Sequence, residues 1–202
     1  MRVHNVLELI FGSPARIRIL RVLASISRPL SGRQVGELAG LTHRGAIHAL
    51  ASLVDIGAVK QRRAGNAYQY SLWKDSIFAE NIVLPAIKAE GRLLDELKRD
   101  VAVRFGHCTV SLVLYGSLAR GEEKKGSDID VMAVVKGERE KAAMEEKAAA
   151  MASYFSERFD GLLSIHCLTV DEVKRRKDLP LLRTVMKEGM IISGKRLSEW
   201  AG

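Results

Sequence analysis

The sequence predicts a mixed α+β protein in which a helical first domain, a connecting helix and a second domain with a mixed sheet follow one another. Apolar residues recur at helical spacing through the first quarter of the chain, alternate at strand spacing over residues 59–72, and then fall into alternating strands and helices from residue 107 onward. A chain of 202 residues can build two small cores. We therefore expect domains at residues 1–74 and 107–202, joined by one or two helices at residues 75–106.

Composition limits the class of protein. Apolar residues make up 47% of the chain and charged residues 28%, which is ordinary for a globular domain. We find neither an apolar run of membrane-spanning length nor a signal-peptide pattern, so we expect a cytoplasmic protein with no membrane partner. Cys108 and Cys167 lack the spacing of a metal site and are predicted to be buried free thiols.

The net charge of +8 is concentrated in the first third of the chain. Residues 1–74 contain 11 Lys and Arg against 3 Asp and Glu, whereas residues 75–202 contain 21 of each. A basic module joined to a neutral one indicates that the first domain meets a polyanion. A surface that is basic only for solubility is the alternative.

Capping signals divide the first domain into three helices. Ser13 precedes a proline at the first helical position, and Ser31 stands three residues before a glutamine in capping-box form. Gly40 suits a helix end, and Thr42 can cap a third helix that runs to about Ile56. The three-residue turn at 40–42 has helix-turn-helix spacing.

The third helix carries a polar stripe. Arg44 and His48 are four residues apart, and His43 lies beside them at the N-terminus. Donors in this arrangement can reach phosphates and base edges while the opposite face is buried, although an ordinary solvated face would look similar. We expect the buried face to consist of Ile47, Leu50 and Val54.

A basic hairpin follows. Residues 59–63 and 67–72 alternate as strands, and Gly65 lies in the tight turn between them. Arg62 and Arg63 are placed near its tip, where they can touch a phosphate backbone or a minor groove.

Three helices and a basic hairpin over residues 8–73 resemble the winged helix-turn-helix domain of bacterial and archaeal metal- and stress-responsive repressors. The segment LTHRGAIHALASLVDIGAVKQRR matches the recognition-helix-to-wing pattern of that family. The resemblance implies transcription regulation through double-stranded DNA. It does not imply metal sensing, because the family's metal-binding cysteines are absent. The DNA-binding residues it implies are His43, Arg44, His48, Arg62 and Arg63.

Residues 75–104 have helical composition, with regularly spaced apolar residues between Glu and Lys. Pro85 removes a helical hydrogen bond, so we expect a kink or two helices meeting near Leu84. This segment can pair with its copy in a homodimer or pack on its own domain, and the sequence does not favour either.

The second domain opens with a buried strand at residues 109–114 that runs into Gly116 and Ser117, a turn that can present backbone N–H groups and a hydroxyl to a phosphate. Further on, Asp128 and Asp130 stand two apart at the start of a strand, so their side chains share one face at a backbone separation of about 6 to 7 Å. Paired carboxylates suit Mg²⁺ or Mn²⁺. A solvated D-x-D tripeptide is the alternative reading.

The segment LYGSLARGEEKKGSDIDVMAVV resembles the signature of the minimal nucleotidyltransferases of the DNA polymerase beta superfamily, and the likeness spans about residues 108–196. It implies a domain that binds a nucleotide triphosphate with Mg²⁺ or Mn²⁺ and transfers a nucleoside monophosphate to a hydroxyl. It assigns Asp128 and Asp130 as the catalytic, metal-binding pair. The phosphate-binding residues it implies are Gly116, Ser117, Arg120 and Ser127.

One position departs from that signature. Members that catalyse transfer carry a third carboxylate on the strand after the long helix, and alignment places Ser164 there. His166 lies on the same strand face as a substitute base or as a structural histidine, and Asp160 precedes the strand by too many residues. The chain is therefore either a transferase or a DNA-binding regulator that binds nucleotide without turnover. Because such domains often occur in two-protein modules, the resemblance also implies a toxin-like protein as a candidate partner.

Overall fold

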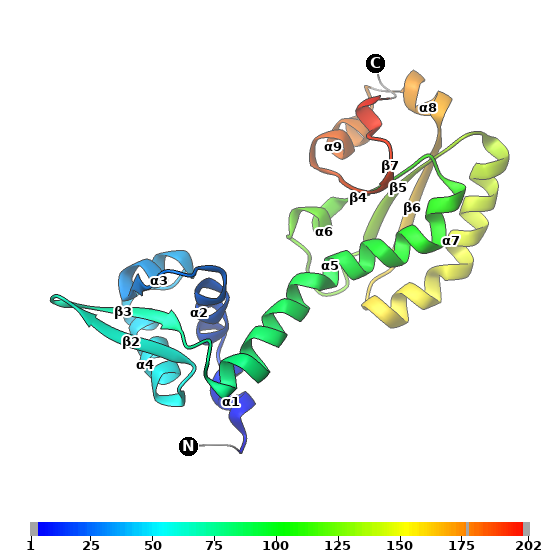
Figure 1. The fold of residues 1–202 in the computed structure, drawn as a ribbon. Helices are drawn as coiled ribbons and strands as arrows, with labels where there is room; N and C mark the ends of the chain where they lie inside the picture. The colour runs from blue at the N-terminus through cyan, green and yellow to red at the C-terminus, as the bar shows by residue number, and fades with distance from the viewer. Residues whose placement is uncertain (1–3, 177, 200–202) are drawn as a thin grey trace. The chain divides into compact units, whose positions relative to one another are not determined.

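The structure, a computed structural model, describes residues 4–176 and 178–199 and confirms the mixed α+β class (Figure 1). The chain divides into two compact units, Met1–Arg92 and Leu93–Gly202. The outer ends of the predicted domains, residues 1–3 and 200–202, lie outside the described residues. Within the described ranges, none of the helices combines the length and the apolar character needed to cross a membrane.

Four helices open the first unit, and the caps predicted for three of them are present. The Ser13 and Thr42 hydroxyls each accept a hydrogen bond from the backbone N–H three residues on, and Ser31 forms a full capping box with Gln34. The left-handed conformation of Gly57, with φ of 83°, ends the last helix. The helices are α1 (Val6–Phe11), α2 (Pro14–Ser25), α3 (Gly32–Leu38) and α4 (His43–Ile56).

A small antiparallel sheet completes this unit. Its strands are β1 (Leu30–Ser31), β2 (Val59–Ala64) and β3 (Ala67–Leu72), in the order β1-β3-β2. Strands β2 and β3 form the predicted hairpin, whose turn contains Gly65 at φ of 61°. Arg63 lies opposite Tyr68 in the register of the hairpin, and both side chains are exposed.

The buried face of α4 differs from the expected one. Ile47 was predicted to be buried, but 37% of its surface is exposed, whereas Leu50 is buried as predicted. Two alanines, Ala46 and Ala49, lie in the core with Leu53. The small alanine side chains let α4 lie close to α2 and α3. The buried face of α4 is therefore rotated by about one residue from the face that Ile47, Leu50 and Val54 predict.

The break expected near Leu84 takes the form of a π-helical segment, η1 (Ala79–Val83), followed directly by α5 (Leu84–Phe105). Pro85 is the second residue of α5. Its missing N–H and its ring are accommodated because the preceding turn is wide, with the Leu84 N–H bonded to the carbonyl of Ala79. The start of α5 packs into the core of the first unit, and its end packs into the core of the second.

The second unit is built on a four-stranded mixed sheet of order β6-β5-β4-β7. Strands β4 and β5 are antiparallel, as are β4 and β7, whereas β5 and β6 are parallel and joined through α7. Its elements are η2 (Gly106–Cys108), β4 (Ser111–Tyr115), α6 (Gly116–Arg120), β5 (Ile129–Val135), α7 (Glu138–Phe159), β6 (Leu163–Thr169), α8 (Val170–Arg175), α9 (Pro180–Glu188), β7 (Met190–Gly194) and η3 (Leu197–Glu199).

Each face of this sheet has its own core. Ile129, Val131 and Ala133 of β5 pack with residues of α5 and α7, whereas Met132 and Val134 pack with residues of α8 and α9. This alternation follows from the period of two along a strand. Asp130 belongs to the series of Met132 and therefore lies on the α8 and α9 side of the sheet.

Both cysteines are free thiols, as predicted. Cys108 is half-buried, and Cys167 is buried in the core between the sheet and α7. Burial raises the pKa of the Cys167 thiol to about 11, so this thiol stays protonated and unreactive at neutral pH.

A network of partly buried charged groups and one tyrosine joins α5 to α7. The Tyr154 hydroxyl donates to an Asp100 carboxylate oxygen at 2.6 Å, and Arg104 and Arg158 lie 3.2 Å and 3.0 Å from the same carboxylate. Burial alone would raise the pKa of Asp100, but the tyrosine hydrogen bond and the two guanidinium charges outweigh it and hold the pKa below its usual range. The folded unit therefore favours the ionised carboxylate.

Replacing Asp100 with alanine should lower the free energy of unfolding of the second unit by about 1 to 2 kcal/mol at neutral pH, because three donors lose a charged acceptor. Asp95→Ala is the control, since it breaks an exposed pair with Lys98 on the same helix and should cost clearly less than Asp100→Ala. Because the pKa is depressed in the folded state, the difference between wild type and Asp100→Ala should be complete above about pH 4 and shrink as the pH falls through the lower folded value. Calorimetric unfolding over a pH series measures both effects, and equal losses from the two variants would contradict this account.

Candidate functional site

The turn from β4 into α6 lies directly against the carboxylate of Asp130. Gly116 begins α6 with φ of 76°, a conformation that L side chains rarely adopt. A Cβ on this residue would overlap an oxygen of the Asp130 carboxylate and lie 3.1 Å from its Cγ. Glycine is therefore required here for two independent reasons, its backbone angle and the space that Asp130 occupies.

The strand register places one neighbour on each side of Asp130. Tyr115 of β4 lies opposite it in the antiparallel pair, and Ser164 of β6 lies beside it in the parallel pair. Asp128 comes just before β5 and is exposed, whereas Asp130 is half-buried. The two carboxylates are thus close in the chain but differ in their access to solvent.

Electrostatics at this site favours the arrival of a cation. Burial raises the pKa of Asp130, the nearby charge of Asp128 raises it further, and Arg120 opposes both effects. The pKa of Tyr115 is also raised, first by burial and then by the charge of Asp130. A divalent cation bound between the two aspartates would relieve their repulsion and favour the ionised form of Asp130.

The donor set fits a metal that receives its remaining ligands from a bound molecule. Nowhere among residues 4–176 and 178–199 do three or more His, Cys, Asp and Glu side chains gather as a metal-binding group, so Asp128 and Asp130 have no third protein ligand of these types. Mg²⁺ is commonly held by one or two carboxylates together with water and phosphate oxygens. Two aspartates beside a turn suited to phosphate satisfy that pattern.

The other residues predicted to bind phosphate differ from one another in burial and in their hydrogen-bond and ion-pair partners. Ser117 is half-buried in the first turn of α6, next to Gly116. Arg120 is exposed at the end of α6 and is paired with Glu122 at 2.7 Å and Glu188 at 3.5 Å, so a phosphate would compete with two carboxylates for it. The Ser127 hydroxyl accepts a hydrogen bond from the Lys124 backbone N–H at 2.8 Å, which closes the loop before Asp128. Ser127 therefore shapes the loop.

The neighbour of Asp130 on β6 is an exposed serine. Ser164 pairs with Asp130 in the register of β5 and β6, and this is the residue that the sequence comparison aligned with the family's third carboxylate. His166, two residues further along β6, is exposed and lies opposite Met132 rather than beside an aspartate. Tyr115 was not predicted as a site residue, although its place immediately before Gly116 at the end of a strand was a usable signal.

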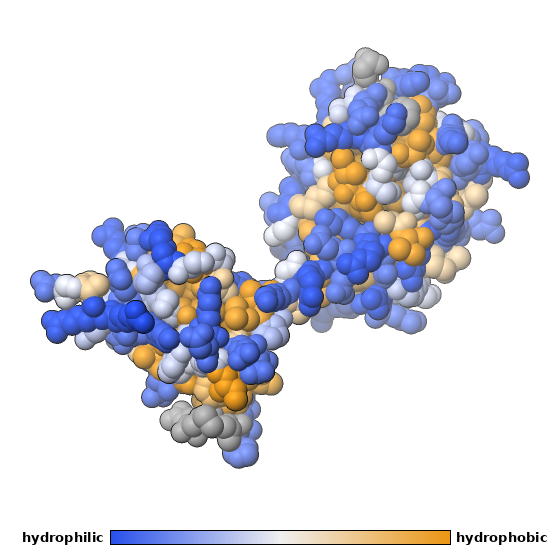
Figure 2. Space-filling view, in the orientation of Figure 1, coloured by the Kyte–Doolittle hydropathy of each residue, from blue (hydrophilic) through white to orange (hydrophobic). Residues whose placement is uncertain are grey.

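A second candidate surface lies on the first unit. His43, Arg44 and His48 are exposed on α4, and Arg62 and Arg63 are exposed on β2. Within the part of the chain that the structure describes, none of the three arginines is paired with a carboxylate, and Arg63 instead donates to the carbonyl of Gly65 at 3.3 Å. Hydrophilic residues cover the outer part of the β2–β3 hairpin, at the left of the view in Figure 2. These three arginines are therefore available to an anionic partner.

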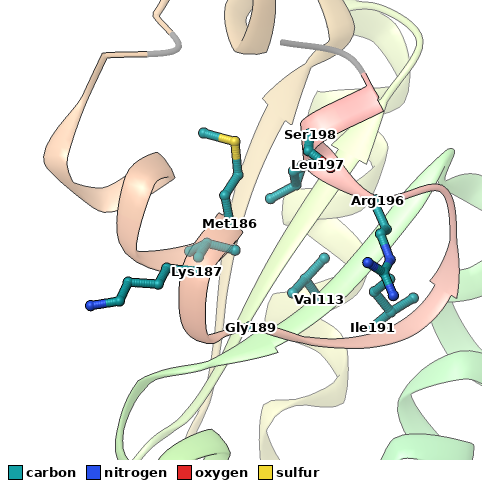
Figure 3. Close-up of a pocket in the computed structure, with 9 residues that line it drawn as sticks. Val113, Met186, Lys187, Gly189, Ile191, Arg196, Leu197 and Ser198 are labelled. Carbon is teal, nitrogen blue, oxygen red and sulfur yellow. The ribbon is translucent and has the colours of Figure 1, made fainter. Parts of the chain in front are cut away.

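A cavity of about 390 Å³ lies elsewhere on the second unit, between the end of α9, β7 and η3 (Figure 3). Val113 lies at its floor, Arg196 extends beside Ile191, and the Lys187 side chain is directed away from it. Among the described residues that line it there is no carboxylate, so this cavity offers no acidic ligand for a metal.

Comparison with known proteins gives a family match and several structural likenesses, among them the two that follow. Residues 93–191 match the family model described as a nucleotidyltransferase domain. No curated protein sequence matches the chain. The crystal structure of the AntR antimony-specific transcriptional repressor is similar at a TM-score of 0.38, with 22% identity over 46% of this chain and 78% of that one. The crystal structure of a toxin-antitoxin with AMP-PNP is similar at a TM-score of 0.38, with 16% identity over 52% of this chain and 80% of that one. Scores this low do not establish a shared fold.

The family match covers the strands and turns that carry the site. It includes the Gly116 turn, both aspartates and Ser164, and it begins one residue after the end of the first compact unit. Domains of this family generally use divalent metals, in keeping with the acidic pair beside the turn. The second unit of the chain is therefore a nucleotidyltransferase domain.

Proposed function

We propose that this protein is a DNA-binding regulator whose nucleotidyltransferase domain binds a nucleotide triphosphate with Mg²⁺ or Mn²⁺ as a ligand. The observation that carries this proposal is the register that puts Ser164, and not a carboxylate, beside Asp130. A serine hydroxyl is a weak metal ligand and a poor proton acceptor near neutral pH, so the site keeps what it needs to bind a metal nucleotide and lacks a base.

The DNA-binding half of the proposal rests on the first unit, which we propose is a winged helix. Its α3 and α4 are joined by a short turn, and its hairpin carries exposed arginines, which is the arrangement that a recognition helix and a wing require. Residues 1–74 of this unit hold the whole charge excess of the chain. Arg44, Arg62 and Arg63 would neutralise phosphates, and His43 and His48 would add donors on the face of α4.

In the second unit, Asp128 and Asp130 would hold the cation, and the phosphates of the nucleotide would complete its coordination. The bound cation supplies charge neutralisation for the phosphates. The Gly116 turn lets the chain approach the phosphates closely because it has no side chain, and Ser117 offers a hydroxyl beside it. Arg120 would reach the phosphates only by leaving Glu122 and Glu188, so binding would rearrange those ion pairs.

Transfer of a nucleoside monophosphate is the second candidate, because the family is named for it. In that reaction the acceptor hydroxyl attacks the α-phosphorus, pyrophosphate leaves, and the hydroxyl proton passes to a base. With serine at position 164, Asp128 and Asp130 would have to accept that proton as well as hold the metal, which makes transfer the weaker candidate. Formation of a labelled product by the wild-type protein would favour this candidate over nucleotide sensing.

Asp130→Asn should abolish stabilisation by nucleotide, because it removes the charge that holds the metal. We expect wild type to gain about 2.7 kcal/mol when a metal nucleotide is present at about 100 times its dissociation constant, and the variant to gain almost nothing. The measurement is thermal unfolding with each of the four common nucleotide triphosphates, with and without Mg²⁺. Asp171→Asn, an exposed aspartate in the first turn of α8, is the control and should behave like wild type. Failure of every triphosphate to stabilise wild type would reject the nucleotide-binding half.

Ser164→Asp should make the second unit dependent on metal. A third carboxylate beside Asp130 raises the folded-state pKa of the cluster above its unfolded value, so without metal the variant should lose about 1 kcal/mol above pH 5 and recover that loss at lower pH. Millimolar Mg²⁺ or Mn²⁺ should restore its stability, and release of pyrophosphate should increase. Ser164→Asn, of similar size and no charge, is the control. Metal-independent stability of Ser164→Asp would show that residue 164 does not share the cation site.

Arg44→Ala combined with Arg62→Ala should weaken binding to duplex DNA and flatten its salt dependence. Each lost phosphate contact should reduce the slope of log K against log salt by about 0.9, so the double variant should lose up to about 1.8. Fluorescence anisotropy with a labelled duplex over a salt series measures this. Arg139→Ala with Arg183→Ala removes the same charge from the second unit and should leave the slope unchanged. An unaltered slope for Arg44→Ala with Arg62→Ala would reject the DNA-binding surface.

A further inference from the structure

The exposed face of α4 carries an apolar stripe beside its polar one. Ile47 is 37% exposed, and Ala51, four residues later, is exposed as well. These positions lie next to Arg44 and His48, which are also four residues apart and exposed. Side chains four apart on a helix stand one above the other, so α4 presents two parallel rows, one of donors and one of methyl groups.

One flank of Ile47 lies against the start of α3. A Cβ on Gly32, the first residue of α3, would lie against the Cδ1 of Ile47 and 3.5 Å from the ring of Tyr70. The absence of a side chain at Gly32 therefore leaves the space that Ile47 occupies. The isoleucine is thus partly covered by α3, and 37% of its surface is exposed.

A partly exposed isoleucine beside cations on α4 could contact an apolar group in the major groove of DNA. Thymine is the base that presents a methyl group there, whereas cytosine presents an N–H donor and guanine presents two acceptors. Ile47 and Ala51 can make neither hydrogen bonds nor ion pairs, so they cannot contribute to binding through phosphates. Apolar contact with a thymine methyl is the recognition that their chemistry permits.

We propose that Ile47, supported by Ala51, contacts the 5-methyl group of thymine and thereby sets a preference for A·T pairs at one position of the DNA site. This inference rests on the proposed function, because it requires α4 to enter the major groove. It assigns sequence discrimination to the apolar row, while Arg44 and His48 supply donors to bases and phosphates.

The test uses the full-length protein and the removal of a single methyl group from the DNA. Duplexes that bind wild type are first selected from a random library, and each thymine of the selected duplex is then replaced in turn with deoxyuridine. Uracil keeps the hydrogen-bonding groups of thymine and lacks only the methyl. At one thymine in each site, the replacement should weaken wild-type binding about fourfold, as expected for losing the burial of one methyl group.

Ile47→Ala should bind the thymine and uracil duplexes equally well at that position, because the partner of the methyl has gone. Ile47→Val is a second variant that keeps most of the packing against Gly32, and it should show a reduced but measurable preference. Ile191→Ala is the matched control, since Ile191 is 39% exposed on β7 of the second unit and its loss should leave the fourfold preference intact.

Three results are distinguishable. If no duplex is selected and no salt-dependent DNA binding is found, the proposed function fails and this inference fails with it. If wild type binds selected duplexes but tolerates uracil at every position, or if Ile47→Ala keeps the same uracil penalty as wild type, the inference alone is overturned. A penalty in wild type that disappears only in the Ile47 variants supports it, because a purely structural role would weaken binding to both duplexes equally.

Discussion

The arrangement of the second unit depends on the close approach of a backbone turn to one carboxylate. Gly116 leaves β4 in a left-handed conformation and lies so near Asp130 that no side chain fits between them. This contact places the start of α6, where Ser117 follows Gly116, against β5, and Asp130 is half-buried there. Burial and the charge of Asp128 both raise the pKa of Asp130, so ionising Asp130 is costly in the free protein. A bound cation would lower this cost by stabilising the ionised carboxylate.

The first unit depends on a different constraint, the small size of the residues between α4 and its neighbours. Ala46 and Ala49 lie in the core, and Gly36 would place a Cβ only 3.2 Å from the Cβ of Ala46. This close packing turns α4 so that Ile47 is partly exposed. The exposure of Ile47 is therefore a consequence of how the core is filled. It adds an apolar group to a helix face that otherwise presents cations and histidines.

Most of the fold could be predicted from the sequence, because its signals are local. The caps at Ser31 and Thr42, the hairpin around Gly65 and the strand start at Asp128 each depend on residues a few positions apart. The rest depends on partners distant in the chain. The exposure of Ile47 follows from buried alanines, which a search for large apolar residues leaves out. The pairing of Arg120 with Glu188 joins α6 to α9, and the position of Tyr115 opposite Asp130 depends on the register of β4 and β5.

The serine beside Asp130 has a consequence for folding as well as for chemistry. A third carboxylate at that position would add repulsion to a pair in which one pKa is already raised, and the unit would then need a cation to reach full stability. With Ser164 in place, the repulsion is limited to two groups, the exposed Asp128 and the half-buried Asp130, and the charge of Arg120 partly offsets it at Asp130. In the function that we propose, the domain would fold without metal and bind a cation when a nucleotide delivers it, as a nucleotide sensor requires.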